Sequence, residues 1–130
     1  MEKVNSNLKP LTVEGSRATL YITCYESNYR LSMTRACIML IGRPERVKIL
    51  ISEDYKSLAV CPAAPDDIAG HPVPNYVYRR SGRFRLSSLS LAVSIWRAMG
   101  WDYEKTYKIV GTLNETENVV VFDLTGAVNE

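Results

Sequence analysis

The sequence predicts a strand-rich α+β protein made of two tandem β-hairpin–helix–β-hairpin units. Runs of β-branched and aromatic residues alternate with turn residues, which is typical of short strands joined by hairpins. Two apolar segments with helical spacing each end at a glycine, Gly42 and Gly100. The motif "YRLS" at 29–32 recurs as "FRLS" at 84–87. A chain of 130 residues with 46% hydrophobic and 23% charged residues fits one soluble globular domain.

Further landmarks follow the two motifs in the same order, which indicates an internal repeat. "VKI" at 47–49 corresponds to "YKI" at 107–109, and "LAV" at 58–60 corresponds to "VVVF" at 119–122. We therefore expect the two units to share one core. The predicted boundaries are an N-terminal arm at 1–16, a first unit at 17–61, a proline-rich linker at 62–75, a second unit at 76–124 and a tail at 125–130.

The first unit is predicted to begin with a strand at 18–25, a turn at 26–28 and a return strand from Tyr29. Ser32 is the expected N-cap of a helix that runs from Met33 to Ile41. Gly42 can adopt the left-handed conformation after that helix. "RVKILI" and "SLAVCP" then form a hairpin around "SEDYK".

The second unit is expected to follow the same plan. "NYVYRR" at 75–80 is predicted to be a strand, "SG" a tight turn and "RFRL" at 83–86 the return strand. Ser87 or Ser88 then caps a helix that ends at Met99. This helix carries Leu89, Ala92, Val93 and Trp96 at i, i+3, i+4 and i+7 and is apolar on most sides, so we expect it to be largely buried, with Trp96 in the core. "TYKIVGTL" and "NVVVFDL" form the last hairpin around "NETEN".

"GRFRLS" at 82–87, the helix after it, Gly100 and "YKIVG" resemble the SpoVT/AbrB-like swapped-hairpin family, which includes MazE-type antitoxins. The resemblance covers 17–61 and 76–124. It implies a pseudo-dimer on one chain, in which two interlaced units close a barrel-like core. It also implies that arginines on the hairpin strands contact DNA. The chain departs from the family pattern at Asn28-Tyr29, where Gly-Arg is usual, and at Ser32 and Ser87, where proline usually opens the helix.

Four arginines stand within seven positions of this motif: Arg79, Arg80, Arg83 and Arg85. Alternate strand residues share a face, so we expect Arg83 and Arg85 to point outward while Phe84 and Leu86 point into the core. The predicted turn would place Arg79 and Arg80 on the opposed strand, and Arg30 is the repeat equivalent of Arg85. Such a ribbon suits the major groove of double-stranded DNA. The alternative is a solvated face, or pairing with Glu115, Glu117 and Asp123 in the acidic segment 110–130.

A second function class is a protein-binding module, either antitoxin-like or a phage-type inhibitor of a host system. Its candidate anchors are Tyr76, Tyr78, Trp101 and Tyr103, because tyrosine, tryptophan and arginine dominate interface hot spots. DNA and a protein partner both stay open at this stage, and so does a homodimer.

The sequence does not predict an enzyme, a cofactor or a metal site. His71 is the single histidine and stands in the proline-rich linker, and no phosphate-loop pattern is present. Cys24, Cys37 and Cys61 lack CxxC spacing, so we expect reduced thiols in a cytoplasmic protein. The N-terminus has no signal-type apolar region, and the longest apolar run, 36–42, is far below the roughly 20 residues of a membrane span.

Overall fold

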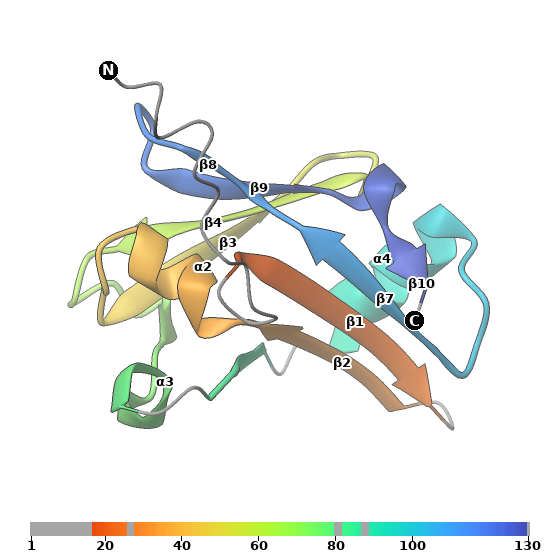
Figure 1. The fold of residues 1–130 in the computed structure, drawn as a ribbon, viewed down its shortest axis with the longest axis horizontal. Helices are drawn as coiled ribbons and strands as arrows, with labels where there is room; N and C mark the ends of the chain where they lie inside the picture. The colour runs from red at the N-terminus through yellow and green to blue at the C-terminus, as the bar shows by residue number, and fades with distance from the viewer. Residues whose placement is uncertain (1–16, 26–27, 80–81, 87–88, 130) are drawn as a thin grey trace, which may run out of the picture.

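The computed structural model describes residues 17–25, 28–79, 82–86 and 89–129 (Figure 1). These residues form two five-stranded antiparallel sheets, with α2 and α3 at one end of the molecule and α4 at the other. Sheet A has the order β10-β7-β1-β2-β6, and sheet B has the order β5-β3-β4-β9-β8. The prediction of a strand-rich α+β fold is therefore confirmed. In the described residues no strand pairing links the two sheets, so they do not close into a barrel.

Both halves of the chain contribute to both sheets. The first half places β1 (Thr19–Tyr25) and β2 (Asn28–Met33) in sheet A, and β3 (Arg46–Ile51) and β4 (Ser57–Ala63) in sheet B. The second half adds β6 (Phe84–Leu86) and β7 (Lys105–Val110) to sheet A, and β8 (Thr112–Asn114) and β9 (Val119–Asp123) to sheet B. The halves meet where β6 pairs with β2, β7 with β1 and β9 with β4. One hydrophobic core lies between the sheets and draws buried side chains from both halves.

The first helix begins later than the sequence suggested. Strand β2 continues through Ser32 to Met33, so α2 spans Arg35–Leu40 with Thr34 as its N-cap residue, and the prediction of Ser32 as cap was wrong. The Thr34 hydroxyl does not cap the helix. It donates to the carbonyl of Arg17 (2.7 Å) and accepts from the N–H of Thr19 (3.0 Å), which fastens the helix start to the start of β1. The predicted terminators after both helices are confirmed, since Gly42 and Gly100 have φ of +100° and +65°.

Residues 75–79 of the strand predicted at 75–80 form a helix instead. Residues Asn75–Arg79 form α3, which opens after Pro74 with a bond from the N–H of Val77 to the Pro74 carbonyl (3.1 Å). The ring of Pro74 fixes its own φ near the helical value, and the helical turn that follows buries Val77 completely. The burial of Val77 outweighs the preference of residues 76–78 (Tyr-Val-Tyr) for a strand, because that preference depends on packing against a neighbouring strand. Strand β6 consequently pairs with β2, and the predicted hairpin across 75–86 was wrong.

The last predicted hairpin is divided between the sheets at Gly111. Residues before it form β7 in sheet A, whereas residues after it form β8, which makes the expected hairpin with β9 in sheet B. The Gly111 N–H donates to the Ala18 carbonyl (2.7 Å). A Cβ atom at this position would lie 2.6 Å from Cε1 of Phe122 and 2.8 Å from Cγ1 of Val120. A side chain here would have to displace Phe122 and Val120, so glycine is favoured at this corner, which transfers the chain from one sheet to the other.

Helix α4 (Leu89–Met99) is confirmed, but it is less buried than predicted. Ala92, Ile95 and Trp96 enter the core, whereas Leu89 is 61% exposed. Trp96 makes edge-to-face contacts with Tyr29, Trp101 and Tyr107, at ring-centroid distances of 5.9, 5.3 and 5.4 Å. The core position predicted for Trp96 is therefore confirmed. No helix among the described segments has the length and apolar character needed to cross a membrane.

The remaining elements complete the sheet edges. The proline-rich segment 62–75 contains the end of β4 and β5 (His71–Pro72), which pairs with β3. After β9, the 3-10 helix η1 (Leu124–Gly126) leads to β10 (Val128–Asn129), which pairs with β7. The cysteines are free thiols, and Cys24 and Cys37 are buried while Cys61 is half-buried.

Candidate functional site

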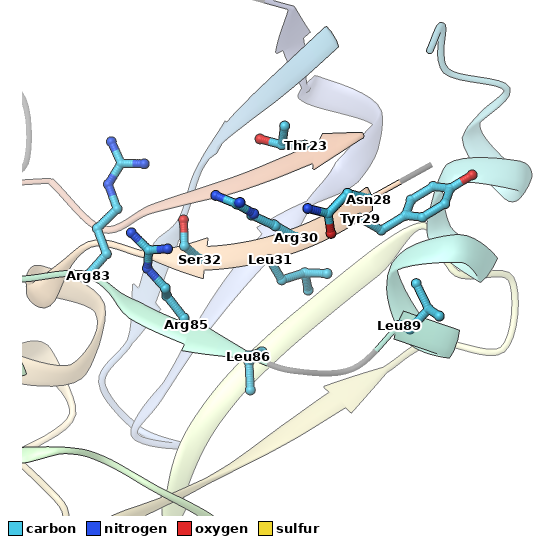
Figure 2. A pocket seen from close by; sticks show the side chains of 10 residues that line it. All are labelled: Thr23, Asn28, Tyr29, Arg30, Leu31, Ser32, Arg83, Arg85, Leu86 and Leu89. Carbon is cyan, nitrogen blue, oxygen red and sulfur yellow. The ribbon is translucent and has the colours of Figure 1, made fainter. Parts of the chain in front are cut away.

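Three arginines gather on the outer face of sheet A. Strand register places Arg85 of β6 opposite Ser32 of β2, and Arg30 lies two residues from Ser32 on the same face. The intervening Leu31 and Leu86 are opposite each other and turn into the core. Figure 2 shows the side chains of Arg30, Arg83 and Arg85 on one side of these strands and those of Leu31 and Leu86 on the other. We call Arg30, Arg83 and Arg85 the arginine face.

Arg83 is held in place by an aromatic ring. Its guanidinium lies 3.9 Å from the ring centroid of Tyr21, which occupies the position opposite Ser32 on β1. A cation–π contact at an exposed site stabilises by about 0.5–1 kcal/mol, which orients the group without neutralising it. The edges of the guanidinium plane keep N–H donors for an external acceptor.

The arginine face has no internal countercharge in the part of the chain that the structure describes. No carboxylate lies within ion-pair distance of Arg30, Arg83 or Arg85, and the ion pair found there joins Lys48 to Asp67 (3.6 Å). The acidic residues considered as partners belong to sheet B and its hairpin: Glu115, Glu117 and Asp123. The Asp123 carboxylate instead accepts from the N–H and the hydroxyl of Thr125. Three exposed cations close together favour an external anion.

A groove with a volume of about 680 Å³ runs beside the arginine face (Figure 2). Its polar side has the three arginines, Asn28 and the hydroxyls of Thr23 and Ser32. Thr23 is fixed by a hydroxyl–hydroxyl bond to Thr106 (3.1 Å). Tyr29, Leu31, Leu86 and Leu89 also border the groove, but Leu31 and Leu86 turn into the core, and only Leu89 among these four is exposed. The volume lies within the range of roughly 300–1,000 Å³ that is usual for small-molecule sites.

Tyr29 borders the groove, packs on Trp96 and stays uncharged at neutral pH. Burial raises the pKa of its phenol, and contact with Cys24 adds to the rise. A neutral phenol adds no negative charge, so the charge among the described lining residues comes from the three arginines.

Of the two other predicted DNA-binding residues, Arg79 does not belong to this face, and the position of Arg80 is not described. Arg79 is exposed at the end of α3, and Arg80 lies outside the described residues. Since β6 pairs with β2, Arg85 neighbours Ser32 rather than Arg79, and the predicted projecting arginine ribbon was wrong. Arg30, predicted from the repeat, does share the face with Arg83 and Arg85. The sequence analysis did not predict that Tyr21, Ser32 and Leu89 lie at this site. The two-residue alternation of a strand, counted from Arg30, could have indicated Ser32.

The aromatic residues predicted as partner anchors lie on separate segments. Tyr76 and Tyr78 are on α3, and only Tyr76 is exposed, because Tyr78 donates to the Pro44 carbonyl and lies beside Arg43. Trp101 stacks on Tyr107 with a centroid distance of 4.2 Å, while Tyr103 is 66% exposed. These contacts give Tyr78 and Trp101 internal structural roles.

Within the described ranges no group of three histidine, cysteine, aspartate or glutamate side chains is placed to hold a metal ion. Comparison of the chain with protein-family models, curated proteins and solved structures found no match.

Proposed function

We propose that this protein is a small regulator that binds double-stranded DNA through the arginine face. The observation that carries the proposal is the placement of three exposed guanidinium groups on one sheet face, with no carboxylate partner among the residues that the structure describes. Guanidinium forms paired hydrogen bonds to phosphate oxygens, and DNA presents phosphates at short, regular intervals. A cationic sheet face of this kind suits the DNA backbone.

The mode of contact differs from a ribbon in the major groove. Strand β6 has three residues and lies at the edge of a five-stranded sheet, so the arginines present a surface rather than a protruding hairpin. Phosphate contacts of this kind fix position and orientation but carry little sequence information. We therefore expect binding with modest sequence preference.

A relationship with the swapped-hairpin family is part of the same proposal. It is supported by the order of elements in each half and by the sharing of both sheets between the halves. The separation of the two sheets and the presence of α3 in place of a strand are departures from it. A barrel is accordingly not part of the proposal.

The test is a titration of labelled blunt duplex DNA at low salt. The variant carrying both Arg83→Ala and Arg85→Ala should bind much more weakly than the wild type. Arg97→Ala removes one exposed cation from α4 and should bind like the wild type. Absence of wild-type binding at low salt would overturn the proposal and favour a protein partner, for which Tyr76 and Tyr103 are exposed.

A further inference from the structure

We propose that the outer face of sheet B is a dimer interface, on which a second copy of this chain packs face to face about a two-fold axis along β4. The inference goes beyond the proposed function, because the arginine face belongs to sheet A, on the other side of the core. It follows from the apolar side chains that sheet B turns away from the core and from the opposite charges on its two flanks.

The outer face of sheet B has a row of apolar and small side chains across its three central strands. Strand register places Leu50 of β3, Ala59 of β4 and Val121 of β9 in this row. Leu50 is 51% exposed and Val121 is 38% exposed. Cys61, a half-buried free thiol, lies two residues from Ala59 on the same face of β4. The row therefore forms an apolar surface on the side of the sheet that faces away from the core.

The sequences of β4 and β9 are those of strands that are covered on both faces. A strand with one face in water normally alternates apolar and polar residues, whereas "LAVC" at 58–61 and "VVVF" at 119–122 are continuous apolar runs. The core covers one face of these strands. No described helix packs along the other face, since α2 and α3 lie at one end of the molecule and α4 at the other (Figure 1). The described part of the chain thus leaves the outer face of sheet B open to a partner.

The charges beside this face indicate that the partner is a second copy. On the β3 side, Lys48 points outward opposite Cys61, and its side chain is 50% exposed although it pairs with Asp67. On the far side, the turn between β8 and β9 has the exposed Glu115 and Glu117, which have no ion pair within the described residues. An axis along β4, the central strand, places the β3 side of each copy against the β8–β9 turn of the other. Lys48 of each copy then meets an acidic turn.

The same axis brings the apolar side chains together. Residues of β4 lie on the axis, so Ala59 and Cys61 each meet their own counterpart, while Leu50 of one copy meets Val121 of the other. A small side chain such as that of Ala59 on the central strand allows the sheets to approach to the spacing of about 10 Å that is usual for packed sheets.

The size of the face predicts a weak dimer. Five strands spaced by about 4.8 Å, with the six residues of β3 rising by about 3.3 Å each, present a planar area of at most about 480 Å². Stable complexes bury roughly 800 Å² on each partner. We therefore expect reversible association with a dissociation constant on the order of 10–100 µM.

The experiment is sedimentation equilibrium of the full chain over concentrations that span this constant. The wild type should change from monomer to dimer as its concentration rises. Val121→Lys and Leu50→Lys each place a charge in the apolar row and should weaken association at least about tenfold. Val110→Lys is the matched control, because Val110 is 46% exposed on the outer face of sheet A, and it should leave association unchanged.

A mixing experiment tests the direction of the axis. Lys48→Glu and Glu117→Lys each create like-charge contacts and should weaken association by about two- to fivefold for each affected pair. An equal mixture of the two variants can form a mixed dimer in which both contacts again join opposite charges. The mixture should therefore associate more tightly than either variant alone, and a mixture that is no tighter overturns the axis along β4.

The other outcomes are equally decisive. A wild type that stays monomeric throughout the concentration range overturns the interface. A dimer that is unchanged in Val121→Lys and Leu50→Lys, with thermal unfolding showing folded variants, overturns its assignment to sheet B. Both positions are exposed in the single chain, so both variants should keep the unfolding midpoint of the wild type. Binding of blunt duplex DNA is measured separately, so failure of the dimer leaves the proposed function standing.

Discussion

The salt dependence of DNA binding tests the arginine face most directly. Each phosphate contact by a cation releases condensed counterions, so log K falls with log salt by about 0.9 per contact on B-DNA. Arg30, Arg83 and Arg85 supply three contacts, which predicts a slope of about −2.7. Between 50 and 200 mM salt, the affinity for blunt duplex should then fall about 40-fold.

Single substitutions measure how much each arginine contributes to the slope of log K against log salt. Arg85→Ala should reduce its magnitude to about 1.8, so the same change in salt should cost only about 12-fold in affinity. Arg85→Lys keeps the charge and should keep the slope near −2.7, while losing affinity because lysine lacks the paired donors of arginine. The assay is anisotropy at four or more salt concentrations with one blunt duplex.

Two control variants show whether the salt dependence of DNA binding comes from the arginine face or from the net charge of the protein. Arg97→Ala and Arg79→Ala each remove one exposed cation from a helix and should leave the slope at the wild-type value. Equal reductions for these variants and for Arg85→Ala would refute the reasoning, because binding would then follow net charge rather than three placed side chains.

The fold itself gives three further predictions. Gly111→Ala places a methyl group 2.6 Å from the Phe122 ring and should lower the free energy of unfolding by about 1–3 kcal/mol in chemical denaturation, whereas Gly126→Ala meets nothing within 4 Å and should be nearly neutral. Thr34→Val leaves the Thr19 N–H and the Arg17 carbonyl without their partner and should cost about 1–3 kcal/mol in the same assay, while Thr34→Ser keeps the hydroxyl and most of the stability. Burial raises the pKa of Cys37 from 9.0 to about 11, so the unfolded thiol ionises first. The stability of the wild type relative to Cys37→Ala should therefore be constant below pH 9 and decline between pH 9 and 11, and a constant difference across that interval would contradict the burial argument.

Local sequence signals were sufficient where an element is stabilised by its neighbours in the chain. The β3–β4 and β8–β9 hairpins follow from alternation around turn residues, and α4 follows from its apolar spacing and Gly100. The arginine face was predicted in part for the same reason, because alternation alone places Arg83 and Arg85 together.

The errors occur where a distant segment decides the structure. Residues 75–79 have strand-forming side chains, but β2 pairs with β6 and 75–79 form α3. Likewise, residues 106–113 have the pattern of one continuous strand. The part before Gly111 nevertheless pairs, as β7, with β1, which lies more than eighty residues earlier in the chain. Neither the identity of a pairing partner nor a change of sheet at Gly111 is encoded in local periodicity.

Arginines from both halves meet on one face because the two matched sequence motifs lie on adjacent antiparallel strands. Leu31 of "YRLS" lies directly opposite Leu86 of "FRLS", so the two copies of the motif pair antiparallel with each other about a local two-fold axis. Such pairing brings the arginine of each motif, Arg30 and Arg85, to the same outer face on adjacent strands. The symmetry is lost further out, where α3 replaces the strand that would correspond to β1 and β7 occupies the free side of β1. The arginine face thus lies where the two motifs pair, and its geometry depends on that pairing rather than on either half alone.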